Sequence, residues 1–377
     1  MAELADIPFD LVRFGGIVER EATDAGLSLH RLPAFARAQV DDPALALLSD
    51  MPAGGRLEIT TDATTIELDL QLTLLQTDDD PIIPAVFDVE VDGDIVQTVS
   101  TTDGTVIVMI SATGGFDIRS GGPTTVRFEL PPGGKLVRIW LPNTAAPRLL
   151  ALRADGVVRP AEALGARRWI HYGSSISHCL EVEQPTGAWP VVAARLAGVD
   201  LQSLAFAGQA QLDPFVARTI ASLPADVISL KIGINLVNAD SMRERTFGPA
   251  LHGLLDLIRD AHPEVPLILC TPIWCGAHEA GFGPTMRGDD GFVYSPRRPG
   301  ELAVGSLTLG RIREIETSII AKRQAAGDAN LHLLSGLELF SEDDAGDLPD
   351  GLHPNPAGYR RMGERFHQLA FVDGPFA

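Results

Sequence analysis

Residues 168–176 have the sequence Arg-Trp-Ile-His-Tyr-Gly-Ser-Ser-Ile, in which a short apolar run leads into a glycine and two serines. Such a run, bounded by small residues, is typical of a strand buried inside a sheet. Similar runs recur downstream, separated by stretches that have helical character. Strands that alternate with helices indicate parallel βαβ units, so we predict a doubly wound, flavodoxin-like α/β domain. Its strands are expected at 168–172, 199–206, 226–232, 266–271 and 330–334, and its helices at 186–197, 214–223, 249–261, 307–326 and 355–369.

The first part of the chain follows a different pattern, because apolar and polar side chains alternate with a period of two. Every second residue from Ile66 to Leu74 is isoleucine or leucine, and residues 87–91 and 126–130 alternate in the same way. One apolar face per strand is the signature of antiparallel sheets packed face to face. We therefore predict a jelly-roll-like β-sandwich domain at 1–155, an α/β domain at 156–377 and a linker around 153–166.

The composition disfavours several classes of partner. The formal net charge of -20 would repel nucleic acid and anionic membranes. Three cysteines are too few for a disulfide framework and favour a reducing compartment. Residues 1–6 lack the pattern of a signal peptide, and no apolar run reaches membrane-spanning length. We expect a cytoplasmic protein whose partners are small molecules, and its oligomeric state stays open.

Serine-based catalysis requires three groups, and the sequence offers a candidate for each. A serine hydroxyl is a poor nucleophile near neutral pH, so it needs a base to remove its proton and a third group to orient that base. Ser175 follows the strand at 168–172, while Asp350 and His353 are close enough in sequence for one turn to aim both at a common point. These residues predict an acyl-transfer enzyme in which Ser175 is the nucleophile, His353 the base and Asp350 the orienting carboxylate.

Acyl transfer also passes through a tetrahedral oxyanion, which hydrogen-bond donors must stabilise. Gly208 follows the second predicted strand, where a glycine lets the backbone N–H approach a substrate closely. Asn235 follows the third strand and can donate through its side-chain amide. Together with the backbone N–H of Ser175, these groups form the predicted oxyanion hole. A structural role stays open for each of them, because serine and asparagine also cap helices and glycine forms ordinary turns.

The order of these residues, serine, glycine, asparagine and then Asp-x-x-His, resembles the SGNH (GDSL-type) esterase and acylhydrolase family. The resemblance covers about residues 168 to 370 and implies an SGNH-type catalytic domain that needs no cofactor. It implies the same roles as above for Ser175, Gly208, Asn235, Asp350 and His353. An N-terminal sandwich joined to such a domain resembles two-domain members, some of which act on sugar esters while others acylate natural products.

The sequence departs from the family pattern in each of the first three motifs. Ser174 replaces the aspartate of the Gly-Asp-Ser signature, and Leu236 stands where the third motif often has aspartate. The second motif has Ser203 or Ala205 in the region where asparagine is often found. An α/β-hydrolase is the alternative fold for a serine enzyme, but residues 173–177 lack the second glycine of its nucleophile elbow.

Four further residues are candidates for the substrate pocket. Trp274 follows the fourth predicted strand, where an aromatic ring can hold an acyl chain, although core packing is an equal alternative. Ser174 adjoins the predicted nucleophile. His171 and His178 flank it and would either line the pocket or pack inside the domain. Cys270, Cys275 and His278 lie close together but lack a second group of ligands at matching spacing, so we predict buried free thiols and no metal site.

The segment 276–305 is rich in glycine and proline and has no predicted strand or helix. Loops of this length are uncommon unless they cover a site or are disordered. We expect a loop that covers the substrate, in which Arg287, Arg297 or Arg298 meets an anionic group. The alternative is that these charges are simply solvated.

The predicted reaction is hydrolysis of an ester, with a small-molecule ester or acyl donor as substrate. Transfer of the acyl group to a hydroxyl of a natural-product or sugar acceptor is the alternative, because the same triad serves both reactions. A binding protein without catalytic activity is a third hypothesis, suggested by Ser174, Ala205 and Leu236.

Overall fold

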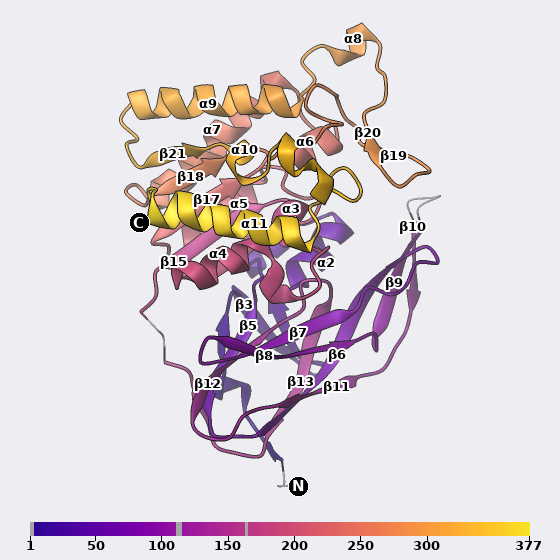
Figure 1. Ribbon diagram of the computed structural model, residues 1–377, viewed down its shortest axis with the longest axis vertical. Coiled ribbons are helices and arrows are strands. Elements are labelled where there is room, and N and C mark those ends of the chain that lie inside the picture. Colours follow the sequence, from indigo (N-terminus) through magenta and orange to yellow (C-terminus); the bar gives the residue numbers. More distant parts are fainter. Residues whose placement is uncertain (1–3, 111–114, 163–164) are drawn as a thin grey trace. The chain divides into compact units, whose positions relative to one another are not determined.

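The computed structural model describes residues 4–110, 115–162 and 165–377 (Figure 1). The chain forms two compact units. The first comprises Met1–Ala34, Val40–Ala166 and Glu183–Thr186, and the second comprises Phe35–Gln39, Arg167–Val182 and Gly187–Ala377. None of the helices in the described ranges combines the length and apolar character that a membrane span requires.

The first unit contains two sheets. The eight-stranded sheet has the order β10 (Gly115–Arg119), β9 (Thr105–Ile110), β6 (Thr65–Thr77), β13 (Ala146–Ala154), β4 (Gly26–His30) and β3 (Glu19–Thr23), with β1 (Ala5–Asp6) on β13 and β11 (Thr124–Glu129) on β6. The six-stranded sheet has the order β14 (Val158–Pro160), β5 (Arg56–Thr61), β12 (Lys135–Trp140), β7 (Ala85–Val91) and β8 (Asp94–Thr101), with β2 (Arg13–Gly15) on β5. Two short helices, α1 (Ala34–Arg37) and α2 (Pro43–Asp50), follow β4.

The apolar face of each alternating strand is buried, as the sequence predicted, and in β7 the polar residues Asp88 and Glu90 are buried as well. The side chains of Ile66, Leu68 and Leu70 in β6 have no exposed surface, and the same holds for Phe87 in β7 and Val137 in β12. These residues from both sheets belong to one apolar cluster. The two sheets therefore pack face to face, and the β-sandwich is confirmed.

One strand pair departs from the predicted antiparallel arrangement. β9 runs parallel to the second half of β6, with Thr73 paired to Thr105, while β11 runs antiparallel along the first half. Between β6 and β9 the chain passes through β7 and β8, which belong to the other sheet. A tight hairpin between β6 and β9 would force antiparallel pairing. The longer connection through the other sheet lets β9 run in the same direction as β6.

The second unit contains a five-stranded parallel sheet. Its order is β16 (Asp200–Ala205), β15 (Arg168–Gly173), β17 (Val227–Lys231), β18 (Leu267–Cys270) and β21 (Leu331–Leu334). Numbered along the chain this is 2-1-3-4-5, the order of flavodoxin-like sheets. Its neighbouring strands all pair in parallel, and β17 and β18 are buried at every position, as expected for a sheet covered on both faces. The predicted α/β class is confirmed.

Helices connect these strands and cover the sheet (Figure 1). α4 (Trp189–Ala197) packs against α11 (Pro356–Phe366), and α5 (Pro214–Ser222) packs against α7 (Glu244–Ala261). The remaining α-helices of the unit are α3 (Ser175–His178), α6 (Ile234–Asn238), α8 (Gly300–Ala303), α9 (Leu309–Ala325) and α10 (Gly336–Leu339).

Helix α7 begins at Glu244, so its predicted start at residue 249 was wrong. Proline is best tolerated in the first turn of a helix, but in α7 it lies beyond that turn. The actual start is marked by Thr246, whose hydroxyl accepts a hydrogen bond from the backbone N–H of Arg243 at 3.1 Å. Pro249 lies inside the helix, where it forfeits one backbone hydrogen bond.

Candidate active site

Ser175 opens α3 directly after β15, at the carboxyl edge of the parallel sheet. The strand ends at Gly173, where a Cβ atom would come within 2.4 Å of the Ser177 hydroxyl oxygen, so no larger residue fits without a shift. The Ser174 hydroxyl accepts a hydrogen bond from the backbone N–H of Ile176 at 3.3 Å and thereby caps α3. Ser175 is the first residue of this helix and is 8% exposed.

Asp350 and His353 share a turn that precedes α11. One Asp350 oxygen, Oδ1, accepts hydrogen bonds from the backbone N–H groups of Leu352 and His353 at 2.9 and 2.7 Å. The other, Oδ2, lies 2.8 Å from Nδ1 of His353. Gly351 has a φ of +79°, a left-handed conformation that suits glycine and makes this tight turn possible. The two backbone hydrogen bonds thus fix the orientation of the Asp350 carboxylate toward the imidazole of His353.

The two segments meet at the histidine. Nε2 of His353 lies 3.0 Å from Oγ of Ser175. With Nδ1–H donating to Asp350, Nε2 is left as the acceptor for the Ser175 hydroxyl. The structure therefore brings the predicted nucleophile, base and orienting carboxylate into one chain of hydrogen bonds.

Local charges shift the pKa values of the acid and the base in opposite directions. Burial alone would raise the pKa of Asp350, but the hydrogen bond and positive charge of His353 and two backbone N–H groups hold it well below its usual value. Burial alone would lower the pKa of His353, but the hydrogen bond to Asp350 and the charges of Glu181 and Asp350 raise it overall. Asp350 is therefore ionised throughout the neutral range and favours a protonated His353.

The side-chain amide of Asn235 has one group that is hydrogen-bonded to the chain and one buried donor that is not, in the part of the chain that the structure describes. It is the second residue of α6, directly after β17, and is 1% exposed. Its Oδ1 accepts a hydrogen bond from the backbone N–H of Ala210 at 3.0 Å, which fixes the orientation of the amide. Its Nδ2 is buried and has no hydrogen-bond partner within the described residues. Leaving a buried donor unpaired costs free energy, so such a group calls for a functional explanation.

Gly208 lies in the loop after β16 and is linked to Asn235 through Gln211. The Gln211 side-chain amide donates to the backbone oxygens of Gly208 and Asn235 at 3.4 and 3.3 Å. Gly208 has a φ of +73°, and the space where a Cβ would lie is empty. Because β16 and β17 flank β15 in the sheet, both residues lie at the same edge as Ser175. Gln211 was not predicted, since a glutamine in a loop carries no distinctive sequence signal.

Two further unpredicted residues adjoin the site: Glu181 lies beside the histidine, and Tyr359 contacts Glu181. Oε1 of Glu181 is 3.7 Å from Nδ1 of His353, and Oε2 of Glu181 accepts a hydrogen bond from the Tyr359 hydroxyl at 2.7 Å. Neither residue belongs to a motif used above. The one clue in the sequence is their closeness to the predicted triad, since Glu181 follows α3, which begins at Ser175, and Tyr359 lies in α11, which follows His353.

The predicted pocket residues differ in their surroundings. Ser174 is fully buried and caps α3, so its side chain has a structural role and no exposed surface. Trp274 follows β18 and is half-buried. Its backbone N–H donates a hydrogen bond to the backbone oxygen of Phe340 at 3.1 Å. His171 is buried between the hydroxyls of Ser229 and Ser177, at 2.7 and 2.9 Å from its two ring nitrogens. It packs inside the domain and does not line a pocket.

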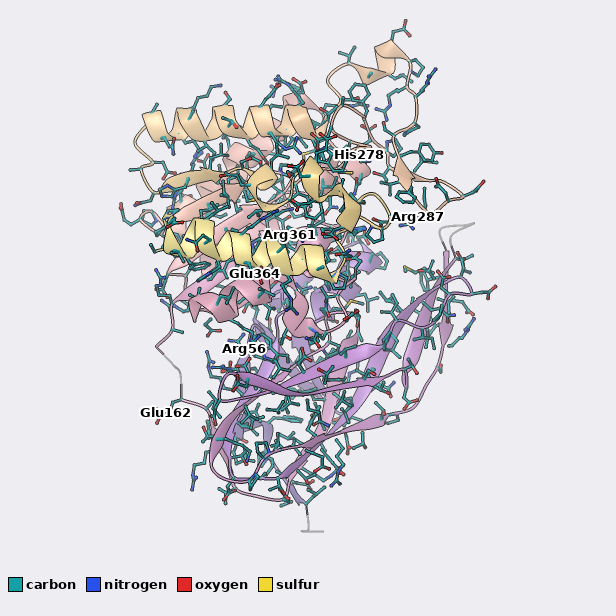
Figure 2. All side chains as sticks on the ribbon, viewed as in Figure 1. Arg56, Glu162, His278, Arg287, Arg361 and Glu364 are labelled. Atoms are coloured by element: carbon teal, nitrogen blue, oxygen red, sulfur yellow. The ribbon has the colours of Figure 1, made fainter. Side chains whose placement is uncertain are left out.

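The three cysteines are also buried, and so is His278, which Figure 2 labels. The Cys275 thiol donates to the backbone oxygen of Gly351 at 3.3 Å, and Nε2 of His278 lies 2.8 Å from the Thr285 hydroxyl. Burial raises the pKa of the Cys270 thiol to about 12. Among the residues that the structure describes, no group of three histidine, cysteine or acidic side chains is arranged to hold a metal ion.

The segment 276–305 contains a small hairpin that contacts the Asp350 turn. β19 (Met286–Arg287) pairs with β20 (Val293–Tyr294), and the backbone N–H of Val293 donates to the backbone oxygen of Asp350 at 2.9 Å. The exposed Arg287 reaches the same residue, with Nη2 3.4 Å from Oδ2 of Asp350 (Figure 2). The hairpin therefore touches the triad directly.

The two remaining arginines of this segment behave differently. Arg297 is exposed to solvent. Arg298 donates to Asp240 at 2.6 Å, to the backbone oxygen of Gly283 at 2.5 Å and to Ser306 at 3.2 Å. Arg298 thus holds the loop together, and its predicted contact with an anionic substrate group is not supported.

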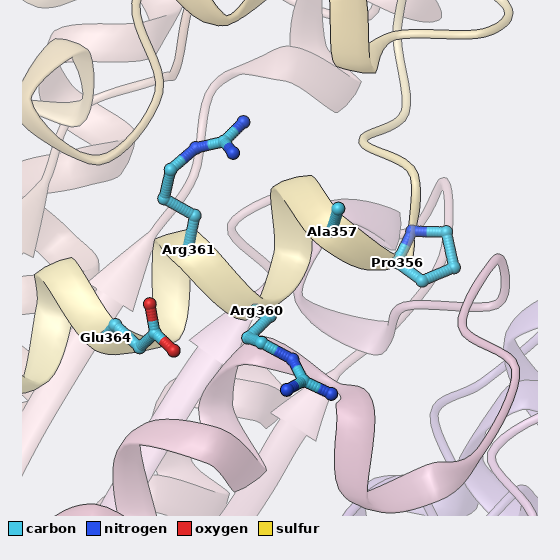
Figure 3. Close-up of a pocket in the computed structure, with 5 residues that line it drawn as sticks. All are labelled: Pro356, Ala357, Arg360, Arg361 and Glu364. Carbon is cyan, nitrogen blue, oxygen red and sulfur yellow. The ribbon is translucent and has the colours of Figure 1, made fainter.

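A hollow on the outer surface of α11 lies apart from these groups (Figure 3). Its lining residues are Pro356, Ala357, Arg360, Arg361 and Glu364. Arg361 is already hydrogen-bonded to Asp344 and Asp347. The hollow contains no member of the triad, so we assign it no role in the chemistry.

Comparison with known proteins supports the family resemblance and the fold. A model of the GDSL-like Lipase/Acylhydrolase family matches residues 171–361, while no curated protein matches the chain. The chain is 25% identical to the salicylyl-acyltransferase SsfX3 from a tetracycline biosynthetic pathway, with a TM-score of 0.79 over 97% of this chain and 95% of that chain. Two other structures share the fold. A putative GDSL-like lipase from Bacteroides ovatus is 18% identical, with a TM-score of 0.67 over 97% and 96% of the two chains. A family two carbohydrate esterase from Clostridium thermocellum is 15% identical, with a TM-score of 0.61 over 96% and 98%.

Proposed function

The chain belongs to the GDSL-like lipase/acylhydrolase family, and on this basis we propose that it is a serine esterase that works through an acyl-enzyme intermediate. The observation that carries the proposal is the chain of hydrogen bonds from the Ser175 hydroxyl through His353 to Asp350. The proposed substrate is a small-molecule ester.

In the acylation step, Oγ of Ser175 attacks the ester carbonyl carbon while its proton passes to Nε2 of His353. Asp350 stabilises the resulting imidazolium through Nδ1. The C–O bond of the ester then breaks, the leaving alcohol takes the proton from His353, and the acyl group stays on Ser175. In deacylation, His353 removes a proton from water, and the water oxygen attacks the carbonyl carbon of the acyl-enzyme. The bond between that carbon and Oγ of Ser175 then breaks, His353 returns the proton to Oγ, and a carboxylic acid is released.

The tetrahedral intermediates carry a negative charge on the former carbonyl oxygen, which three donors would stabilise. The backbone N–H of Ser175 has no acceptor inside its own helix, because it belongs to the first turn. The backbone N–H of Gly208 and the unpaired Nδ2 of Asn235 are the other two. Fixed donors in a buried site need little reorganisation as charge develops, which is the usual origin of oxyanion stabilisation.

Acyl transfer to a hydroxyl is the second candidate reaction. The same acyl-enzyme would form, and an alcohol would replace water in the second step. The similarity to a salicylyl-acyltransferase, which extends over nearly the whole of both chains, favours this alternative.

Pre-steady-state release of nitrophenol from p-nitrophenyl acetate tests the proposal, with Ser175→Ala as the control. We expect a burst of about one equivalent per enzyme, absent from the Ser175→Ala variant, because the burst measures acylation of that serine. Sustained turnover after the burst supports the esterase, whereas a burst followed by near silence supports the transferase.

Two outcomes would overturn the proposal. A burst of equal size from the Ser175→Ala variant would mean that another group is acylated. Absence of both the burst and fluorophosphonate labelling of Ser175 would favour a binding protein without catalytic activity.

A further inference from the structure

Nδ1 of His353 faces two carboxylates, of which the proposed mechanism uses one. Asp350 lies 2.8 Å away and accepts the N–H hydrogen bond, and Oε1 of Glu181 lies 3.7 Å away. Glu181 follows α3, the helix that starts at Ser175, whereas Asp350 comes from the turn before α11. The two negative charges therefore approach the imidazole from different elements.

The Glu181 carboxylate is held in place by a buried tyrosine. Tyr359 lies in α11, has no exposed surface, and its hydroxyl donates to Oε2 of Glu181 at 2.7 Å. This contact occupies one oxygen of the carboxylate and leaves Oε1 as the one nearest His353. A charge-assisted hydrogen bond of this kind is stronger than one between neutral groups and fixes the direction of the acceptor.

We propose that Glu181, anchored by Tyr359, is a positioning residue that acts through His353 and stabilises its imidazolium as a second carboxylate. The inference rests on the proposed function of Ser175 and His353. When the Ser175 proton moves to Nε2, the positive charge on the ring lies beside both Asp350 and Glu181. The proton then leaves to the departing alcohol, and Glu181 itself neither gains nor loses one.

The charges around His353 support this role. Glu181 and Asp350 favour the protonated ring, Arg287 from β19 opposes it, and burial also opposes it. The net effect raises the pKa of His353. Burial and the charge of Glu181 raise the pKa of Tyr359 well above its usual value, so the tyrosine stays a neutral donor. Of the two acidic groups, Asp350 supplies the hydrogen bond and Glu181 supplies charge.

The experiment compares Glu181→Gln with Glu183→Gln, a matched variant that removes one negative charge at an exposed position two residues further along. The acylation rate of Ser175 is measured across pH from the p-nitrophenyl acetate burst. For Glu181→Gln we expect the midpoint of the profile to move to lower pH and the plateau rate to fall on the order of tenfold, because the imidazolium loses a nearby negative charge. We expect Glu183→Gln to follow the wild-type profile.

Tyr359→Phe tests the anchor. It should shift the profile in the same direction as Glu181→Gln but by less, since the carboxylate stays charged while its orientation is lost. In the Glu181→Gln background the tyrosine substitution should have little further effect, as a double-mutant cycle would show. A purely structural contact between α11 and residue 181 would lower stability without moving the midpoint.

Titration of the His353 ring by NMR, with the signal assigned by its loss in His353→Gln, gives a readout that needs no turnover. A lower midpoint in Glu181→Gln supports the inference, and an unchanged midpoint overturns it. If the midpoint falls but Ser175 shows neither a burst nor labelling by a fluorophosphonate, the electrostatic role stands and the proposed function fails. The two failures are thus distinguishable.

Discussion

Oγ of Ser175 lies 3.0 Å from Nε2 of His353, although 178 positions separate the two residues in the chain. Ser175 follows β15, an inner strand of the sheet, and His353 lies in the turn before α11. The contact is therefore produced by the parallel sheet, which places the residues following its strands at one edge, together with α11, which packs beside α4.

The pH dependence of acylation should follow the ionisation of His353. The neutral ring is the active base, and its pKa is raised, so the rate should rise with pH through a midpoint above the usual value of about 6.5. Asp350→Asn removes the charge that favours protonation, so the midpoint should move down while the plateau rate falls on the order of 10⁴-fold. Burst kinetics between pH 5 and pH 9, a range chosen to bracket about 6.5, measure both quantities. A wild-type midpoint at or below that value contradicts this account.

Substitutions of Asn235 should distinguish the contribution of its donor group, Nδ2, from that of its acceptor group, Oδ1. Asn235→Asp keeps an oxygen for the backbone N–H of Ala210 but removes the unpaired Nδ2, and Asn235→Ala removes both. Both variants should acylate about a hundred- to a thousandfold more slowly, because the oxyanion loses one donor. Thermal unfolding serves as the control and should show the smaller loss of stability for Asn235→Asp. If Asn235→Asp acylates at nearly the wild-type rate, the side chain is not part of the oxyanion hole.

Arg287 and Arg298 should differ in what they affect. Arg287 is exposed beside Asp350, so Arg287→Gln should change the free energy of unfolding by less than about 0.5 kcal/mol. If it contacts the substrate, the variant should lose more activity toward an anionic ester than toward a neutral one. Paired assays with p-nitrophenyl acetate and a nitrophenyl hemisuccinate measure that ratio, and equal losses would exclude a substrate contact.

Arg298→Gln should act on stability instead. The substitution breaks charged hydrogen bonds to Asp240 and to the backbone of Gly283, each worth about 1.5–3 kcal/mol. Urea denaturation should therefore show a clear loss of stability, with the ratio of anionic to neutral ester hydrolysis unchanged. A change in that ratio without loss of stability would return Arg298 to the substrate site.

His171 should make the α/β unit sensitive to acid. Burial and the charge of Lys231 lower the pKa of His171 to about 3, whereas the unfolded chain has the usual value of about 6.5. Between these values the unfolded state binds one more proton, so the free energy of unfolding should fall by about 1.4 kcal/mol for each unit of acidification. His171→Gln cannot titrate, and its stability should lack this part of the slope. Urea unfolding at several pH values tests the difference, and identical slopes would refute it.

The elements that could be predicted from the sequence are those with a local signal. Period-two alternation located the sandwich strands, and buried apolar runs located the five parallel strands of the α/β sheet. The triad candidates were found because short motifs fix their spacing and order. Asn235 could be proposed from its place after β17, and its unpaired Nδ2 is a detail that only the folded structure supplies.

The features that escaped prediction depend on contacts between distant segments. Glu181 and Tyr359 meet across 178 positions, and neither has a distinctive neighbourhood in the sequence. One partner of Arg298, Asp240, lies in another loop, and a second, Gly283, lies earlier in its own segment. Its charge alone could therefore not reveal whether it binds substrate or the chain itself. The parallel pairing of β9 with β6 depends on a detour through the other sheet, which no local pattern encodes.

The separation of Ser175 from its base has a consequence for biosynthesis. A chain growing on the ribosome carries the serine long before it carries Asp350 and His353. Its hydroxyl keeps the weak reactivity of an ordinary serine until residues 350–353 have been made and have folded beside it. In the proposed mechanism, reactivity therefore appears only after the whole parallel sheet has been translated, and a half-made chain lacks the base that would activate its serine.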